Sequence, residues 1–94
     1  MTMTTQKLFQ IIKERKEKMP KGSYVTSLFE AGLDRIVQKV GEEATEVVIA
    51  AKNKDKKQVI SEVADLRFHL LVMIAALDIE PSEIDQELER RMKD

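Results

Sequence analysis

The sequence predicts a small all-α domain, and three observations support this. Apolar residues recur with helical spacing along most of the 94 residues, no stretch alternates as strands do, and capping residues with Pro or Gly separate the helical stretches. A chain of this length can bury one hydrophobic core and has no room for a second. We therefore expect one domain over residues 1–94, a small bundle of four to five helices.

The first expected helix begins at Thr4 or Thr5, whose hydroxyls can cap it, and ends before Pro20 and Gly22. Its apolar side is predicted to face the core and its charged side to face water. The apolar residues are Leu8, Ile11 and Ile12, and the charged residues are Lys13, Glu14, Lys16 and Glu17.

One short helix is expected before a pair of long helices and another short helix after it. One runs from a cap at Ser23 to Gly32, a residue type that tolerates the left-handed exit from a helix. The other starts at Pro81, because proline suits the first helical turn, and presents Ile84 and Leu88 on one face. The charged motifs lie on the longer pair.

The first long helix is expected over about 34–51, followed by the basic turn 52–57. Asp55 and Gln58 fit a capping box that opens the second long helix, which reaches about Leu77. Helices joined by a short turn normally pack antiparallel. Each long helix carries an apolar arc, and the two arcs should face each other. The arcs are Ile36, Val40, Ala44, Val47 and Ala51 on the first, and Val59, Val63, Leu66, Leu70, Met73 and Leu77 on the second.

Carboxylates lie beside both arcs in matching phase. Glu43 and Glu46 on the first helix, and Glu62 and Asp65 on the second, are each three residues apart and so are neighbours on one helix face. Either pair alone would be ordinary solvated charge. Together, on antiparallel helices, they predict a four-carboxylate cluster. Such a cluster needs a neutralising cation, and Mg²⁺, which prefers oxygen ligands, fits best.

Three further residues lie near these acids. Glu42 points further toward solvent than Glu43, so we expect it to act through its charge or at the edge of the site. His69 follows Asp65 by one turn, and because Mg²⁺ prefers oxygen we expect it to support the site through a hydrogen bond. Arg67 lies inside the apolar arc, where it either extends past the packing or pairs with an acid at a subunit contact.

The composition excludes several classes of function. The chain has no cysteine, which excludes disulfides and thiolate zinc sites. Its net charge of -1 suggests no general affinity for nucleic acid. No apolar run is long enough to cross a bilayer and no export signal is recognisable, so we expect a cytoplasmic protein with no membrane partner.

The segment over about 22–77 resembles a known family. The two carboxylate pairs are similar to those of the MazG-like all-α nucleotide pyrophosphatases, and the string Gln38-Lys-Val-Gly-Glu-Glu43 narrows the resemblance to phosphoribosyl-ATP pyrophosphohydrolase. Arg67 and Phe68 depart from the commoner family pattern, which has an aliphatic residue and a tyrosine there. Further matching stretches are Ser23-Tyr24, Gly32-Leu-Asp-Arg35, Ala50-Ala-Lys-Asn53 and His69-Leu-Leu-Val72.

The resemblance implies a stand-alone, Mg²⁺-dependent enzyme that hydrolyses phosphoribosyl-ATP to phosphoribosyl-AMP and pyrophosphate, the second step of histidine biosynthesis. It implies that the metal-binding and catalytic residues are Glu43, Glu46, Glu62 and Asp65. Lys39 lies one turn before Glu43 within the family string and is the first candidate for a phosphate contact, with Lys21 and Arg35 weaker. The expected substrate-binding residues are Lys39, Glu42, Lys52, Lys54 and His69.

Two other functions stay open. A MazG-like pyrophosphatase acting on other nucleoside triphosphates would use the same carboxylates, whereas a helical interaction module would need no divalent metal. A homodimer is also expected, because the second long helix has a second apolar face that one neighbouring helix cannot cover. This second face consists of Ile60, Ala64, Phe68, Leu71 and Ala75.

Overall fold

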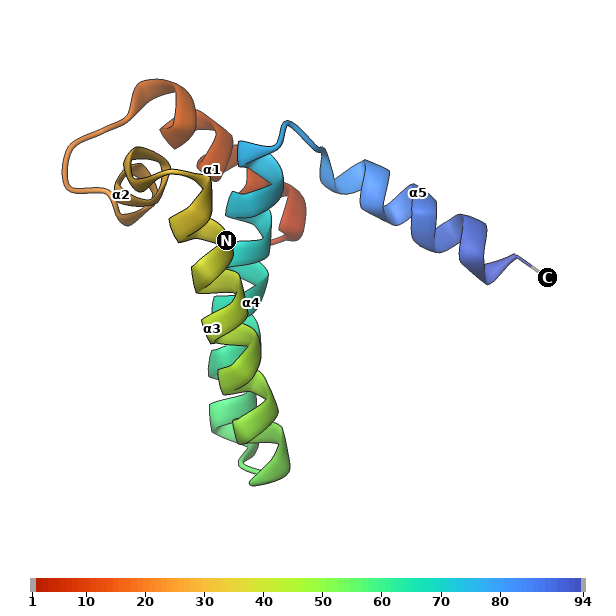
Figure 1. Cartoon of the computed structure of the whole chain (residues 1–94). Coiled ribbons are helices and arrows are strands. Elements are labelled where there is room, and N and C mark those ends of the chain that lie inside the picture. Colours follow the sequence, from red (N-terminus) through yellow and green to blue (C-terminus); the bar gives the residue numbers. More distant parts are fainter. Residues whose placement is uncertain (1, 94) are drawn as a thin grey trace.

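The computed structural model describes residues 2–93, which form five helices and no strand. The helices are α1 (Thr5–Lys18), α2 (Tyr24–Ala31), α3 (Leu33–Lys52), α4 (Lys56–Ala76) and α5 (Pro81–Met92). α3 and α4 lie side by side in opposite directions as a long hairpin, and α1 and α2 gather at the end away from its turn (Figure 1). The prediction of an all-α chain built on a long antiparallel pair is confirmed.

Side chains cap three of the helices as the sequence predicts. Thr4, Ser23 and Asp55 each accept a hydrogen bond from the backbone N–H three residues later, at 3.1, 3.3 and 3.2 Å. These bonds satisfy N–H groups that the first turn of a helix leaves free. The capping box expected at α4 is wrong in its second half. The Gln58 side chain donates to Glu62 at 2.9 Å instead of returning to Asp55.

The hydrophobic core lies where α1, α2, the start of α3 and the second half of α4 meet. Its buried residues are Phe9, Ile12, Val25, Leu28, Ile36, Leu71, Val72, Ile74 and Ala75. The face of α4 that enters this core was predicted wrongly. Val63, Leu70 and Leu77 are exposed, whereas Leu71 and Ala75, which were assigned to the second apolar face, are buried. α4 packs against α1 in addition to α3. Because apolar residues lie all around α4, their spacing alone does not select its inner face.

The chain leaves much apolar surface uncovered. Its Cα radius of gyration of 14.5 Å exceeds the value of about 12 Å expected for a compact domain of this length. The hairpin projects from the core, and α5 points away from it with α1 as its main contact (Figure 1). Exposed apolar residues include Val37, Val48 and Ile49 on α3, Ile60, Val63, Leu70 and Leu77 on α4, and Ile84 and Leu88 on α5.

Within residues 2–93, no helix combines the length and the apolar character needed to cross a membrane. α4 shows why, because acidic and basic side chains interrupt its apolar residues.

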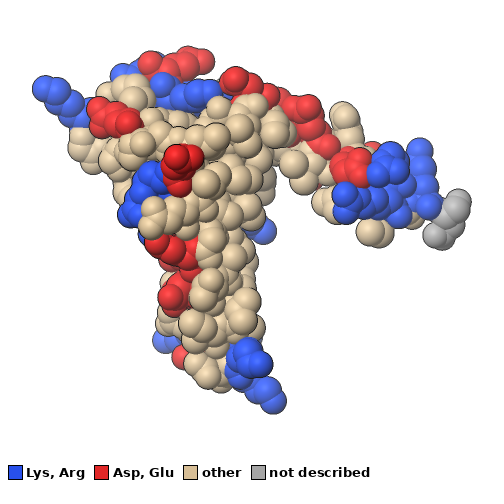
Figure 2. All heavy atoms as spheres, in the orientation of Figure 1, with Lys and Arg blue, Asp and Glu red and all other residues tan. Residues whose placement is uncertain are grey.

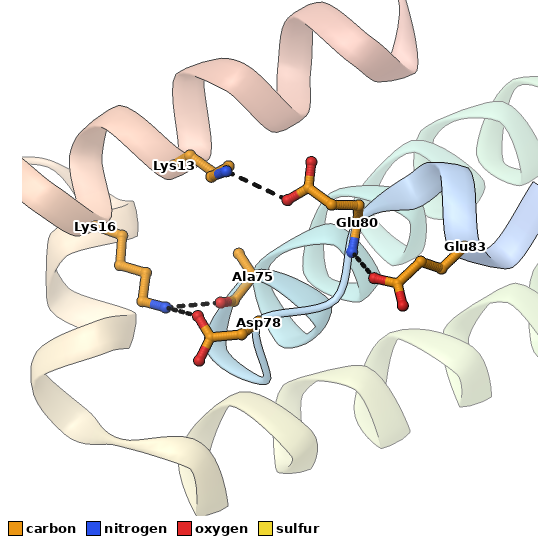
Figure 3. Close-up of polar contacts among 6 residues, drawn as sticks. All are labelled: Lys13, Lys16, Ala75, Asp78, Glu80 and Glu83. Atoms are coloured by element: carbon orange, nitrogen blue, oxygen red, sulfur yellow. Dashed lines mark hydrogen bonds and ion pairs between the residues drawn. The ribbon is translucent and has the colours of Figure 1, made fainter.

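Two lysines of α1 hold the end of α4 and the start of α5 (Figure 3). Lys16 Nζ donates to the carbonyl oxygen of Ala75 at 2.8 Å and to Asp78 at 3.1 Å. Lys13 Nζ donates to Glu80 at 3.2 Å. Both lysine side chains stay partly exposed to water, as predicted, but the sequence did not predict their partners. Their partners lie 59 to 67 positions later in the chain, beyond the reach of helical periodicity.

Candidate metal centre and nucleotide site

Three carboxylates meet across the hairpin. Glu43 comes from α3, and Glu62 and Asp65 come from α4. Each contributes one oxygen atom to a group in which all three atoms lie within 4.8 Å of one another. The two α4 acids share a face because they are three residues apart, and the antiparallel pairing brings Glu43 opposite them. The structure thus brings together three of the four predicted metal ligands.

Two other acids lie at the edge of this cluster. Glu46 is exposed and stands outside the 4.8 Å group, although its charge still acts on Glu62. Glu42 accepts a hydrogen bond from Gln38 at 2.9 Å. Its side chain is 48% exposed, compared with 14% for Glu43, so it lies further out, as the sequence predicts.

The crowding of carboxylates affects Glu62 most clearly. Partial burial raises the pKa of Glu62, the charges of Glu43, Asp65 and Glu46 raise it further, and the hydrogen bond from Gln58 opposes the rise. The ionised form of Glu62 is therefore less stable in the folded chain than in water. Figure 2 shows acidic side chains gathered along the hairpin beside a basic group. A cation bound among these oxygens would favour their ionised forms.

Lys39 is the cation that touches the cluster. Its Nζ lies 3.3 Å from Glu43 and 3.6 Å from Glu42, and its side chain is only 18% exposed. Burial by itself would lower the pKa of Lys39, but Glu43, Tyr24 and Glu42 together raise it. Lys39 is therefore protonated at neutral pH. A single lysine cannot neutralise three carboxylates, so the cluster keeps a net negative charge.

His69 is buried and is bonded through both ring nitrogens. Nδ1 lies 2.7 Å from the carbonyl oxygen of Asp65, and Nε2 lies 2.9 Å from the hydroxyl of Tyr24. A carbonyl can only accept, so Nδ1 donates to Asp65, while Nε2 shares a hydrogen bond with the tyrosine hydroxyl. Both nitrogens are engaged within the chain, which favours the expected supporting role of His69 over direct contact with a metal or substrate.

Tyr24 belongs to the site although sequence reasoning gave it no role. Its ring is half exposed, stacks on Phe68 with centroids 6.0 Å apart, and lies close enough to Lys39 to raise the pKa of that lysine. The available signal was its place beside Ser23 in the family-like string. Helical periodicity could not find it, because the contact joins α2 to a residue 45 positions later.

The two lysines of the hairpin turn lie away from the cluster. Lys52 ends α3 nine residues after Glu43, which is about 13 Å along the helix axis. Lys54 lies in the turn itself, with a left-handed φ of 56°, and both side chains are exposed. Basic side chains mark this tip of the hairpin in Figure 2. The fold of one chain does not bring them to the acidic oxygens.

The donor set suits a hard divalent cation. The cluster offers carboxylate oxygens only, the neighbouring His69 is engaged elsewhere, and the chain has no cysteine. Mg²⁺ usually binds through a few carboxylates, keeps several waters and accepts phosphate oxygens from a nucleotide. An open group of three carboxylates therefore fits Mg²⁺ better than zinc.

Comparison with known proteins identifies the family. The family model described as phosphoribosyl-ATP pyrophosphohydrolase matches residues 5–92. The phosphoribosyl-ATP pyrophosphatase of Clostridium botulinum (strain Hall) is 50% identical over 84 residues, which cover 89% of this chain and 76% of that protein. The protein of the same name from Listeria monocytogenes serotype 4a is 56% identical over 84 residues, covering 89% and 81%. That of Geobacter sulfurreducens is 46% identical over 86 residues, covering 92% and 80%. The acidic hairpin and these matches together show that the chain belongs to the phosphoribosyl-ATP pyrophosphohydrolase family.

Proposed function

We propose that this chain is a cytoplasmic, Mg²⁺-dependent enzyme that hydrolyses phosphoribosyl-ATP to phosphoribosyl-AMP and pyrophosphate, as a step of histidine biosynthesis. The observation that carries the proposal is the cluster of Glu43, Glu62 and Asp65 across the hairpin of a chain of this family. Curated relatives are named phosphoribosyl-ATP pyrophosphatase, and one is named Histidine biosynthesis bifunctional protein HisIE. These names support both the substrate and the pathway.

Hydrolysis between the α and β phosphates requires neutralised phosphate oxygens and a water placed in line with the leaving pyrophosphate. When bound, Mg²⁺ supplies positive charge to the phosphate oxygens. Glu43, Glu62 and Asp65 hold it, and Glu46 extends the set at its exposed edge. A carboxylate that is not used as a ligand can accept the proton of the attacking water, and Glu46 and Glu42, at the edge of the cluster, are the candidates for this role.

Lys39 is the first phosphate contact in this proposal. Its ammonium group is held beside the acidic oxygens by Glu43 and Glu42 and remains available to a phosphate oxygen entering the same space. Lys52 and Lys54 remain predicted contacts with the substrate, at a greater distance along the hairpin. His69 keeps the turn of α4 that carries Asp65 in place and bonds Tyr24.

The chain is also proposed to be a homodimer. The uncovered apolar residues of the hairpin, such as Ile60, Val63 and Leu70, need a partner to leave water, and a second copy offers the same surface. Light scattering at micromolar concentration should give twice the mass of one chain. A monomer under those conditions would contradict the dimer.

The activity test follows the products by phosphorus NMR, with Mg²⁺ and either phosphoribosyl-ATP, ATP or a dNTP. We expect pyrophosphate as product and a strong preference for phosphoribosyl-ATP. Equal or faster turnover of a dNTP would place the chain among the MazG-like enzymes that act on other nucleotides. Complete inactivity of the parent, matching that of Glu43→Gln, would favour a non-enzymatic interaction module.

A further inference from the structure

An apolar groove runs along residues 59–74 of α4, and we call it the α4 groove. It consists of two hollows of about 310 and 440 Å³ that meet at Arg67. The other α4 residues that line these hollows are apolar, and Ile60, Val63 and Leu70 among them are exposed to water. A continuous apolar surface of this kind usually marks an interaction site.

α5 carries an apolar stripe that the rest of the described chain leaves exposed. Ile84, Leu88 and Met92 are spaced four residues apart, so they lie on one face of the helix, and each is exposed. α5 points away from the core and has α1 as its main contact (Figure 1). A helix of 12 residues is only marginally stable in water without packing. The α5 stripe, which these three residues form, therefore needs a surface that covers it.

The unpaired charges of these two surfaces are complementary. Arg67, in the middle of the α4 groove, forms no ion pair with any described residue. Asp85 and Glu89 each follow a residue of the α5 stripe by one position, and neither is paired with a described residue. Both arginines of α5 are paired with Glu87. Covering Arg67 without an acid would be costly, so a helix whose apolar stripe is bordered by free carboxylates suits this groove.

The junction with α1 directs α5 away from its own α4 groove. Lys13 donates to Glu80 at 3.2 Å, directly before α5 begins (Figure 3). Lys16 donates to Asp78 at 3.1 Å in the same short connection between α4 and α5. The first turn of α5 lines the end of its own groove, and the rest of the helix leads away from it (Figure 1). Folding α5 back over its own α4 would break these contacts, whereas the helix as placed is free to meet a second copy.

We propose that two copies of the chain exchange their α5 helices, so that each α5 stripe lies in the α4 groove of the other copy, with Asp85 and Glu89 beside Arg67. This inference rests on the homodimer of the proposed function and names the segments that join its two copies. α5 is about 18 Å long and the α4 groove about 22 Å, so the helix fits within the groove. A two-fold dimer fills both grooves with both helices and leaves neither surface uncovered.

The position of α5 can be tested with a spin label, because the chain has no cysteine of its own. Gln86→Cys carries the nitroxide on the face of α5 opposite the α5 stripe. This variant, without isotope, is refolded from urea together with the ¹⁵N-labelled parent, so any broadening in the parent comes from a partner copy. We expect broadened amide signals at Ile60, Val63 and Arg67, and their recovery once ascorbate reduces the nitroxide.

Two variants of α5 test the α5 stripe itself. Leu88→Asp places a charge on the stripe and should raise the dissociation constant of the dimer at least about tenfold, because the charge would be buried without a partner. Gln86→Asp adds the same charge on the opposite face and should leave the dissociation constant nearly unchanged. Both side chains are exposed within one chain, so neither change disturbs its core. Sedimentation equilibrium gives both constants, and equal effects would overturn the role of the stripe.

Charge reversal tests the pairing across the two copies. Arg67→Glu should raise the dissociation constant of the dimer at least about tenfold, because it places like charges together. Arg15→Glu is the matched control, since Arg15 is exposed on α1 and does not line the α4 groove. Adding Asp85→Arg and Glu89→Arg to Arg67→Glu should recover most of the lost affinity. Absence of this recovery, or an equal effect of the control, would overturn the pairing.

Light scattering on the refolded mixture separates this inference from the proposed function. The mass of a dimer without broadening at residues 60–67 would overturn the exchange of α5 and leave the proposed homodimer standing. The mass of a single chain would overturn both. The proposed hydrolysis is tested by its own assay, so a dimer with the expected broadening but no pyrophosphate release would refute the activity and support the exchange.

Discussion

Two charged regions of this chain differ in whether their carboxylates have a lysine partner. Where α1, α4 and α5 meet, Asp78 and Glu80 each have a lysine at 3.1 to 3.2 Å (Figure 3). In the middle of the hairpin, the three clustered carboxylates have one ion pair with a described residue, that of Glu43 with Lys39. The first region is complete within one chain, whereas the second carries charge that the chain leaves uncompensated.

The difference separates charges that hold the fold from charges that await a ligand. Oppositely charged pairs on a surface contribute little to the free energy of unfolding, and because their charges cancel they do not need a further ion to neutralise them. Like charges held close raise one another's pKa values and oppose folding until a cation binds. The predictions below test this contrast, from the largest expected effect to the smallest.

Removing one charge from the cluster should abolish most of the activity. Glu62→Gln keeps the shape of the side chain but replaces one carboxylate oxygen by an amide nitrogen and removes the negative charge. We expect kcat for phosphoribosyl-ATP to fall by about a hundredfold or more. Glu83→Gln is the matched control, because Glu83 accepts a hydrogen bond from the Glu80 backbone at the far junction. The measurement is pyrophosphate release. Similar losses in both variants would mean that the cluster has no special role.

Mg²⁺ should stabilise the fold through the cluster alone. At a hundred times its dissociation constant, a cation that binds only the native state adds about 2.7 kcal/mol to the free energy of unfolding. Calorimetric melting with EDTA and then with millimolar Mg²⁺ should show this in the parent and in Lys16→Met. Asp65→Asn should not respond. An unchanged melting temperature of the parent would mean that no site forms without the substrate phosphates.

The junction should prove important for stability and neutral for metal binding. Lys16→Met removes the hydrogen bonds to Ala75 and Asp78, so urea unfolding should show a loss of about 1 to 2 kcal/mol in the free energy of unfolding. Lys18→Met is the control, since it removes only a surface pair within α1 and should cost less than about 0.5 kcal/mol. Equal effects would show that the contact between helices adds nothing.

The smallest predicted effect is a pH dependence that has opposite sign at two carboxylates. The folded chain holds the proton of Glu62 more tightly than the unfolded chain does, because its pKa is raised. Ionised Glu62 therefore destabilises the metal-free fold above the raised pKa, and this penalty disappears as the pH falls toward the ordinary glutamate range. In EDTA at pH 7, Glu62→Gln should have a higher urea midpoint than the parent, and the difference should shrink in acid.

Glu87 provides the opposite case. Hydrogen bonds from Arg90 and then Arg91 lower the pKa of Glu87, so its ionised form stabilises the fold above the ordinary glutamate range. That contribution is lost as the pH falls through the lowered pKa. Glu87→Gln should therefore have a lower midpoint than the parent at pH 7, with the difference vanishing in acid. The same sign at both positions would contradict the contrast between paired and crowded carboxylates.

The sequence was sufficient for features that depend on neighbouring turns. Caps at Thr4, Ser23 and Asp55, and the shared face of Glu62 and Asp65, follow from spacings of three residues. The antiparallel hairpin follows from a turn too short for another arrangement. These local rules account for the five helices and for three of the four predicted acids in the cluster.

The spacing of apolar residues along the sequence could not predict contacts between helices that are distant in the chain. The inner face of α4 was misassigned because its apolar residues surround the helix, and only the docking of α1 selects Leu71 and Ala75 over Leu70. The bonds of Lys16 across the core and of Tyr24 to His69 were missed for the same reason. Sequence spacing describes one helix at a time, whereas the surroundings of these residues depend on contacts with a second helix.

The bond from Lys16 to Ala75 also has a consequence for the order of folding. The hairpin can form from contacts close in sequence, but the carbonyl of Ala75 near the end of α4 gains an additional hydrogen bond from a residue 59 positions earlier. Contacts between such distant residues close large loops and tend to form late. A late contact affects the rate of unfolding more than the rate of folding. Stopped-flow measurements on Lys16→Met should therefore show faster unfolding with nearly unchanged folding, so this one lysine governs how long the native chain persists once formed.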